Sequence, residues 1–166
     1  PATPVPADSA AAVNPIDAFV QQRALAAGLK LAPQANELVL QRRLAFDLTG
    51  LPPAPELKEL AWEETVDRLL AAPAFGERLA VWWLDLVRYA DSEGYFADSY
   101  RNVYPYRDYV VRSFNANKPF DRFTLEQMAG DLLPGAGWEE KIGSGYNRLI
   151  LPTHEDGANE GEYRAR

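Results

Sequence analysis

Apolar residues recur along most of the chain at three- and four-residue spacings, which is the periodicity of amphipathic helices. Asn14 followed by Pro15 predicts the start of a first helix, because asparagine caps helix N-termini and proline fits the first helical turn. Gly28 predicts its end. The apolar stripe of this helix is expected to consist of Ile16, Phe19, Val20 and Leu25.

A second helix is predicted over residues 34–48, with Gly50 and the proline-rich run 51–55 ending it. Residues 56–70 continue the helical pattern in two pieces, and Pro73 is expected to stop it. The positions expected to face inward are Leu38, Leu40, Leu44, Ala45 and Leu48 in the second helix, and Val66, Leu69 and Leu70 in the third.

The most heavily apolar helix is predicted over residues 75–89, and its burial is expected to anchor the domain. Its apolar residues at helical spacing are Leu79, Trp82, Trp83, Leu86 and Tyr89. After it, residues 91–103 contain glycine and serine without apolar periodicity, which predicts an ordered surface loop.

Three more helices are predicted over residues 104–115, 121–132 and 138–146. Because no window shows the strict alternation of a half-buried strand, the predicted fold class is all-α, an irregular multi-helix bundle of about six to seven helices with long ordered loops. Residues 1–13 are rich in proline and alanine and predict a linker, so the helical domain is expected to occupy residues 14–166.

The amino-acid composition excludes several classes of function. The 166 residues contain no cysteine, which excludes disulfides, thiolate nucleophiles and covalent haem attachment within this sequence. A net charge of −7 opposes nucleic acid as a partner, because phosphate backbones need a positive surface. No apolar run approaches the roughly 20 residues needed for a membrane span.

The strongest polar candidate follows the tryptophan-rich helix. Asp85 and Arg88 are three residues apart and can pair on one helical face, and Asp91 follows directly. With Arg107 and Asp108 they form a candidate polar site, in which an arginine fork could hold a carboxylate or sulfate. The alternative is a structural ion pair that orients the end of the helix.

Aromatic residues gather in the same region and are candidates for stacking against a sugar ring or a flat partner surface. They are Tyr95, Phe96, Tyr100, Tyr104 and Tyr106. Packing within the loop and the core is the competing interpretation.

The only histidine lies in an acidic stretch near the end of the sequence, where carboxylates and glycines resemble the ingredients of a metal site. Its candidate ligands are His154, Glu155, Asp156 and Glu160. Their spacing matches no metal motif, and a solvated acidic tail is the simpler interpretation. No serine or cysteine is placed for a catalytic triad, and the carboxylates support a hydrolase only by their number.

Several motifs occur in an order that resembles a known family. Residues 14–20 read Asn-Pro-Ile-Asp-Ala-Phe-Val, residues 42–53 run from Arg-Arg-Leu to Gly-Leu-Pro-Pro, and residues 83–92 run from Trp-Leu-Asp to Asp-Ser. Tyr106-Arg107-Asp108 and residues 127–134 follow. In this order the motifs are similar to the planctomycete cytochrome-c-associated domain of unknown function, over residues 14–166.

This resemblance implies context and supplies no catalytic residues. It implies an exported protein, periplasmic or extracellular, with cytochrome-c-like segments and a haem c motif beyond Arg166, so that the sequence is expected to be the N-terminal portion of the domain. The expected partners are the remainder of the parent polypeptide and a redox partner or polysaccharide. We rank a scaffold for a redox region first, a carbohydrate- or protein-binding module using residues 91–109 second, and a hydrolase third.

Overall fold

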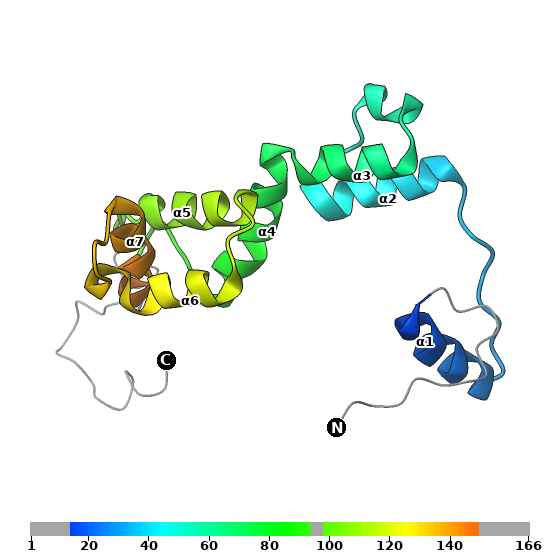
Figure 1. Cartoon of the computed structure of the whole chain (residues 1–166), viewed down its shortest axis with the longest axis horizontal. Coiled ribbons are helices and arrows are strands. Elements are labelled where there is room, and N and C mark those ends of the chain that lie inside the picture. The colour runs from blue at the N-terminus through cyan, green and yellow to red at the C-terminus, as the bar shows by residue number, and fades with distance from the viewer. Residues whose placement is uncertain (1–13, 94–97, 150–166) are drawn as a thin grey trace. The chain divides into compact units, whose positions relative to one another are not determined.

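The structure is a computed structural model of the 166-residue chain, and it describes residues 14–93 and 98–149. In these residues the fold is all-α, as predicted, and an isolated antiparallel bridge between Ser92 and Tyr100 is the only β-type pairing. The chain forms two compact units, residues 1–37 and 38–166. Figure 1 shows the helices of each unit. The predicted linker over residues 1–13 lies outside the described residues.

The described part of the first unit is built around helix α1 (Pro15–Ala26). The Asn14 side chain accepts hydrogen bonds from the backbone N–H groups of Ile16 and Asp17, and Asp17 accepts one from Asn14, which completes a capping box. Gly28 ends the helix with φ of 69°, as predicted. The apolar stripe, however, is not buried: Ile16 is 73% exposed, and Ala18 is the buried residue of α1.

The second unit begins with a small cluster of helix α2 (Glu37–Thr49), the 3-10 turn η1 (Pro55–Glu59) and helix α3 (Trp62–Leu70). Residues 56–70 are therefore helical in two pieces, as predicted. The buried apolar residues of this cluster are Ala45, Leu57 and Leu69. Two inward positions were predicted wrongly, since Leu38 is 63% and Leu70 is 42% exposed.

In both helices a polar side chain occupies a buried position. Gln41 is buried and its amide donates a hydrogen bond to the Leu57 carbonyl over 3.4 Å. Thr65 is fully buried and its hydroxyl donates to the Ala61 carbonyl one turn earlier. A polar side chain whose hydrogen bonds are satisfied can replace leucine in a small core.

The buried face of helix α4 (Pro73–Leu86) consists of other residues than the predicted apolar stripe. The preceding helix ends at Leu70, as predicted, and Pro73 begins α4, in keeping with the fit of proline to the first turn. Trp82 and Leu86 are 56% and 72% exposed, whereas Gly76 and Ala80 are buried. These small residues allow the neighbouring helix to approach closely, which a stripe of large side chains would prevent.

That neighbour is α5 (Tyr104–Asn115), whose range matches the prediction. The main core lies between α4, α5 and helix α6 (Phe120–Ala129), where Tyr106, Tyr109 and Phe123 are buried. The Trp83 ring meets the Phe123 ring edge-on, with centroids 5.0 Å apart, and Tyr109 stacks on Phe123 at 5.9 Å. Contacts between aromatic rings thus make up much of the main core.

The last elements are η2 (Gly130–Leu132), helix α7 (Trp138–Gly143) and η3 (Ser144–Arg148). Helix α7 contacts both α5 and α6, and it lies near one end of each in Figure 1. Leu149 follows η3 and is buried in the main core. Across residues 14–93 and 98–149, no helix combines the length and apolar character required to traverse a bilayer.

Candidate functional site

A buried polar network lies at the centre of the main core. The indole Nε1–H of Trp83 donates to the Gln127 Oε1 atom over 3.0 Å and to the Tyr106 hydroxyl oxygen over 3.1 Å. The Tyr106 hydroxyl donates to the same Gln127 oxygen over 2.5 Å. Burial raises the pKa of Tyr106 to about 12, although the Trp83 hydrogen bond opposes this shift. Tyr106 therefore remains a neutral donor and cannot serve as a base near neutral pH.

A second polar cluster surrounds the carboxylate of Glu126, whose side chain is 4% exposed. Lys118 and Arg122 contact its two oxygens at 2.5 and 2.6 Å, and Tyr109 donates its hydroxyl over 2.9 Å. Burial alone would raise the pKa of Glu126, but the hydrogen bonds from Lys118, Tyr109 and Arg122 lower it overall. The carboxylate stays ionised and links α5, α6 and the turn between them.

Three residues of the predicted polar site are brought together around Tyr89. The Tyr89 hydroxyl donates to Asp91 Oδ1 over 2.5 Å, and Arg107 forms an ion pair with the adjacent Asp108 over 2.9 Å. Burial, and then the hydrogen bond to Asp91, raise the pKa of Tyr89. The hydrogen bond to Asp108 raises the pKa of Arg107.

Asp85 and Arg88 do not form the predicted side-chain pair. The backbone N–H of Arg88 donates instead to the Asp85 carbonyl over 3.2 Å, and that of Tyr89 to the Leu84 carbonyl over 2.9 Å. These two bonds form a Schellman motif that ends α4, with Arg88 in the left-handed region at φ of 56°. Asp85 and Arg88 are therefore close because their backbone groups end the helix. The residues of the candidate polar site that remain together are Asp91, Arg107 and Asp108.

Arg107 and Asp108 also line a pocket of about 540 Å³ between α4 and α5. Its apolar lining is contributed by Ala80, Val81, Leu84 and Val111. Its charged lining consists of Arg107 paired with Asp108 at 2.9 Å, together with Glu77 and Arg112, so the pocket offers little net charge to a ligand.

The predicted stacking residues have different environments. Tyr100 and Tyr104 are 72% and 44% exposed, whereas Tyr106 is only 3% exposed and stacks between Tyr89 and Tyr109. Tyr95 and Phe96 lie outside the described residues. Of the predicted stacking set, Tyr100 and Tyr104 are the described residues with substantial surface for a partner.

The predicted metal ligands His154, Glu155, Asp156 and Glu160 all lie outside the described residues, so that prediction stays open. Within the described ranges, no group of three or more histidine, cysteine or acidic residues could hold a metal ion.

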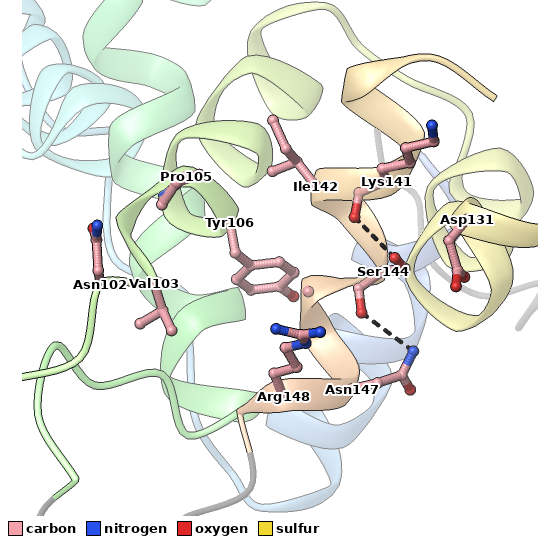
Figure 2. A pocket seen from close by; sticks show the side chains of 11 residues that line it. Asn102, Val103, Pro105, Tyr106, Asp131, Lys141, Ile142, Ser144, Asn147 and Arg148 are labelled. Atoms are coloured by element: carbon pink, nitrogen blue, oxygen red, sulfur yellow. Dashed lines mark hydrogen bonds between the residues drawn. The ribbon is translucent and has the colours of Figure 1, made fainter.

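A pocket of about 500 Å³ opens where the start of α5 meets η2, α7 and η3. Figure 2 shows the Tyr106 ring and the Arg148 guanidinium directed toward each other in it, while the Lys141 side chain extends away from Tyr106. Its apolar lining consists of Val103, Pro105, Tyr106 and Ile142, and its polar lining includes Asn102, Asp131, Lys141, Ser144, Asn147 and Arg148.

A family model described as PSCyt2, a protein of unknown function (DUF1549), matches residues 15–166. The chain belongs to this family. Membership in the PSCyt2 family confirms the sequence resemblance at the level of a domain family of unknown function. No curated protein and no solved structure is detectably similar to this PSCyt2 chain.

Sequence reasoning missed the two polar clusters and Arg148. Glu126 and Gln127 lie in a helix that was predicted correctly in type, but a charged residue and an amide there are ordinarily expected at the surface. Tyr109, which contacts Glu126, and Trp83, which contacts Gln127, lie 17 and 44 residues away in sequence. No local pattern contains that information.

Proposed function

We propose that residues 38–149 are a rigid scaffold that holds the segment following Leu149, within an exported cytochrome-c-like protein. The observation that carries this proposal is the anchoring of η3 and Leu149 to the rest of the unit. The Asn147 Nδ2 group donates to the Gln127 and Ser144 carbonyls, each over 3.2 Å, and the Arg101 guanidinium donates to the Arg148 carbonyl. Leu149 itself is only 6% exposed.

This anchoring suits a supporting role because it fixes Leu149, the last residue of the described range, in the core. A buried leucine resists displacement by roughly 1.5–3 kcal/mol of transfer free energy. The hydrogen bonds add orientation that apolar packing alone does not specify. The family resemblance supplies the remaining part of the proposal, namely export and a neighbouring redox region.

The residues of this chain do not fit a covalently attached haem, because the sequence contains no cysteine. Any haem c in the proposal is held by residues beyond Arg166. The helical unit would then support the haem-bearing region mechanically, with no step of electron transfer assigned to its side chains.

The test uses the parent polypeptide extended beyond Arg166 and matured in a host competent for haem c attachment. A sharp reduced α band in the visible spectrum is the expected result, and its absence would overturn the cytochrome part of the proposal. Thermal unfolding followed at that band and by far-ultraviolet circular dichroism is expected to give one shared transition. Independent melting of the visible signal would overturn the scaffold part.

A matched pair of variants sharpens the second measurement. Asn147→Asp replaces the donating amide by an acceptor that faces carbonyl oxygens, so both transitions should fall together. Asn102→Asp makes the same chemical change at an exposed asparagine and is expected to leave both transitions near their original temperature.

The exposure of Tyr100 and Tyr104 favours a second candidate, a module that binds carbohydrate or a protein partner through the loop 91–109. Calorimetric titration with neutral hexasaccharides tests the carbohydrate case. Saturable binding that is lost in a Tyr100→Ala, Tyr104→Ala double variant would support it. Binding that is unchanged in that variant, or undetectable, would exclude these tyrosines as a stacking surface for these sugars.

A further inference from the structure

Arg148 is a cation in a pocket, and no acidic side chain among the described residues lies within ion-pair distance of it. The five ion pairs found in residues 14–93 and 98–149 involve other arginines and Lys118. The backbone of Arg148 is nevertheless fixed, because it ends η3 and its carbonyl accepts a hydrogen bond from Arg101. The Arg148 side chain therefore starts from an anchored backbone at the pocket, and its guanidinium has no acidic partner among the described residues.

The pocket combines the Arg148 cation with apolar side chains. The guanidinium points toward the Tyr106 ring, and Val103, Pro105 and Ile142 contribute apolar surface beside it (Figure 2). At about 500 Å³ the pocket falls within the size range of small-molecule sites. This combination of one charged group and apolar walls matches a ligand with one anionic group on a compact apolar or ring-shaped body.

The charges around the pocket indicate a monoanion. Arg148 and Lys141 contribute two positive charges to the lining, and Asp131 contributes one negative charge. This net positive lining stands out in a chain whose net charge is −7. A dianion such as a phosphate monoester would be attracted by the two cations but also repelled by Asp131. A carboxylate carries a single negative charge and fits the planar arginine fork with two parallel hydrogen bonds.

We propose that this pocket binds a small ring-bearing carboxylic acid, with Arg148 pairing with the carboxylate and the Val103, Pro105 and Ile142 side chains contacting the ring. This binding activity is separate from the scaffold role and does not use the exposed Tyr100 and Tyr104. Tyr106 also lines the pocket, and its hydroxyl is held by hydrogen bonds with Trp83 and Gln127.

The proposal is tested by titrating the 166-residue chain with benzoate and with D-glucuronate, followed by two-dimensional ¹H–¹⁵N NMR. We expect at least one of these acids to bind saturably with Kd of about 1 mM or tighter, with shifts at residues 102–106 and 142–148. Benzamide and methyl glucuronate ester match the two probes without the charge and should bind at least about tenfold more weakly. Phenyl phosphate should also bind more weakly than benzoate.

Variants assign the effect to Arg148. Arg148→Gln and Arg148→Lys should each weaken binding by about tenfold or more, because lysine keeps the charge but loses the planar fork. Arg43→Gln changes an exposed arginine of α2 outside the pocket and should leave the affinity unchanged. Circular dichroism confirms that each variant is folded.

Two results would overturn the proposal. One is the absence of saturable shifts with both acids up to about 20 mM, a range that covers even weak small-ligand sites. The other is carboxylate binding that persists unchanged in Arg148→Gln. Neither result bears on the scaffold proposal, which is measured on the extended polypeptide by the coupling of two unfolding transitions.

Discussion

The hydroxyl of Tyr109 donates a hydrogen bond over 2.9 Å to the carboxylate of Glu126, a charged group that is almost completely buried. Lys118 completes this arrangement from the turn before α6, with its ammonium also 4.6 Å from the centroid of the Tyr109 ring. The pair joins α5 to α6 through polar contacts and stacks against the aromatic core. A change of charge at Glu126 is therefore expected to lower the stability.

Glu126→Gln is expected to lower the free energy of unfolding by about 2–3 kcal/mol, because two cations lose their shared carboxylate while part of the polar contact remains. Urea unfolding at pH 7 measures this change. Glu139→Gln is the control, since Glu139 is half exposed and pairs with Arg112 at the surface, where little loss is expected. Equal effects of the two substitutions would contradict the structural role of Glu126.

The lowered pKa of Glu126 predicts how the free energy of unfolding depends on pH. The folded-state pKa of Glu126 is lowered, so its contribution is fully present above its unfolded-state pKa of about 4.3 and is lost as pH falls through the folded value. Unfolding free energies measured from pH 6 downward should therefore decline more steeply in the original chain than in Glu126→Gln. Parallel curves would show that other carboxylates control acid unfolding.

Gly130→Ala is expected to destabilise the fold because η2 and α7 are in backbone contact at this position. A Cβ atom on Gly130 would lie 1.9 Å from the Glu140 carbonyl oxygen, which belongs to the helix backbone and cannot rotate aside. The loss should be about 3 kcal/mol. Gly145→Ala is the control, because its Cβ would meet Tyr106 at an ordinary 3.6 Å. Thermal unfolding of the two variants compares them directly.

Gln127→Leu should cost about 2–3 kcal/mol, because the Tyr106 hydroxyl loses its buried acceptor and the Trp83 indole N–H loses one of its two. Urea unfolding gives the size of the loss. The same substitution at exposed Gln22 in α1 is expected to have little effect. If Gln127→Leu left the free energy of unfolding unchanged, apolar packing of the leucine would compensate for the lost hydrogen bonds. The polar network would then not be what holds Tyr106 in place.

Arg88→Gly is expected to stabilise the protein. Arg88 occupies the left-handed region at the end of α4, a conformation that costs a non-glycine residue about 1–2 kcal/mol. Glycine removes this cost but gains entropy in the unfolded chain, which leaves a net gain of about 0.5–1 kcal/mol. Arg88→Ala keeps the backbone strain and should show no such gain. Calorimetry on the two variants separates the loss of the side chain from the relief of strain.

The sequence alone determined the local structure of this protein. Asn14 and Gly28 marked the ends of the first helix because capping depends on side chains within a few residues of the terminus. Residues 104–115 were predicted to the residue, and the all-α class followed from helical periodicity without strand alternation. The ordered motifs also indicated the family, because motif order is a property of the chain itself.

Only the tertiary structure decided which faces are buried and which side chains meet. Trp82 and Trp83 are adjacent in sequence and equally apolar, yet Trp82 is 56% exposed and Trp83 packs in the core. The small residues Gly76 and Ala80 select the face that α5 covers. Gln127 and Tyr106 meet from segments 21 residues apart, and Glu126 receives its Tyr109 hydrogen bond from another helix. The surroundings of Arg148 depend on how η3 meets α5. Periodicity reports that a helix has an apolar side, but the approach of its neighbours decides which of its residues become core.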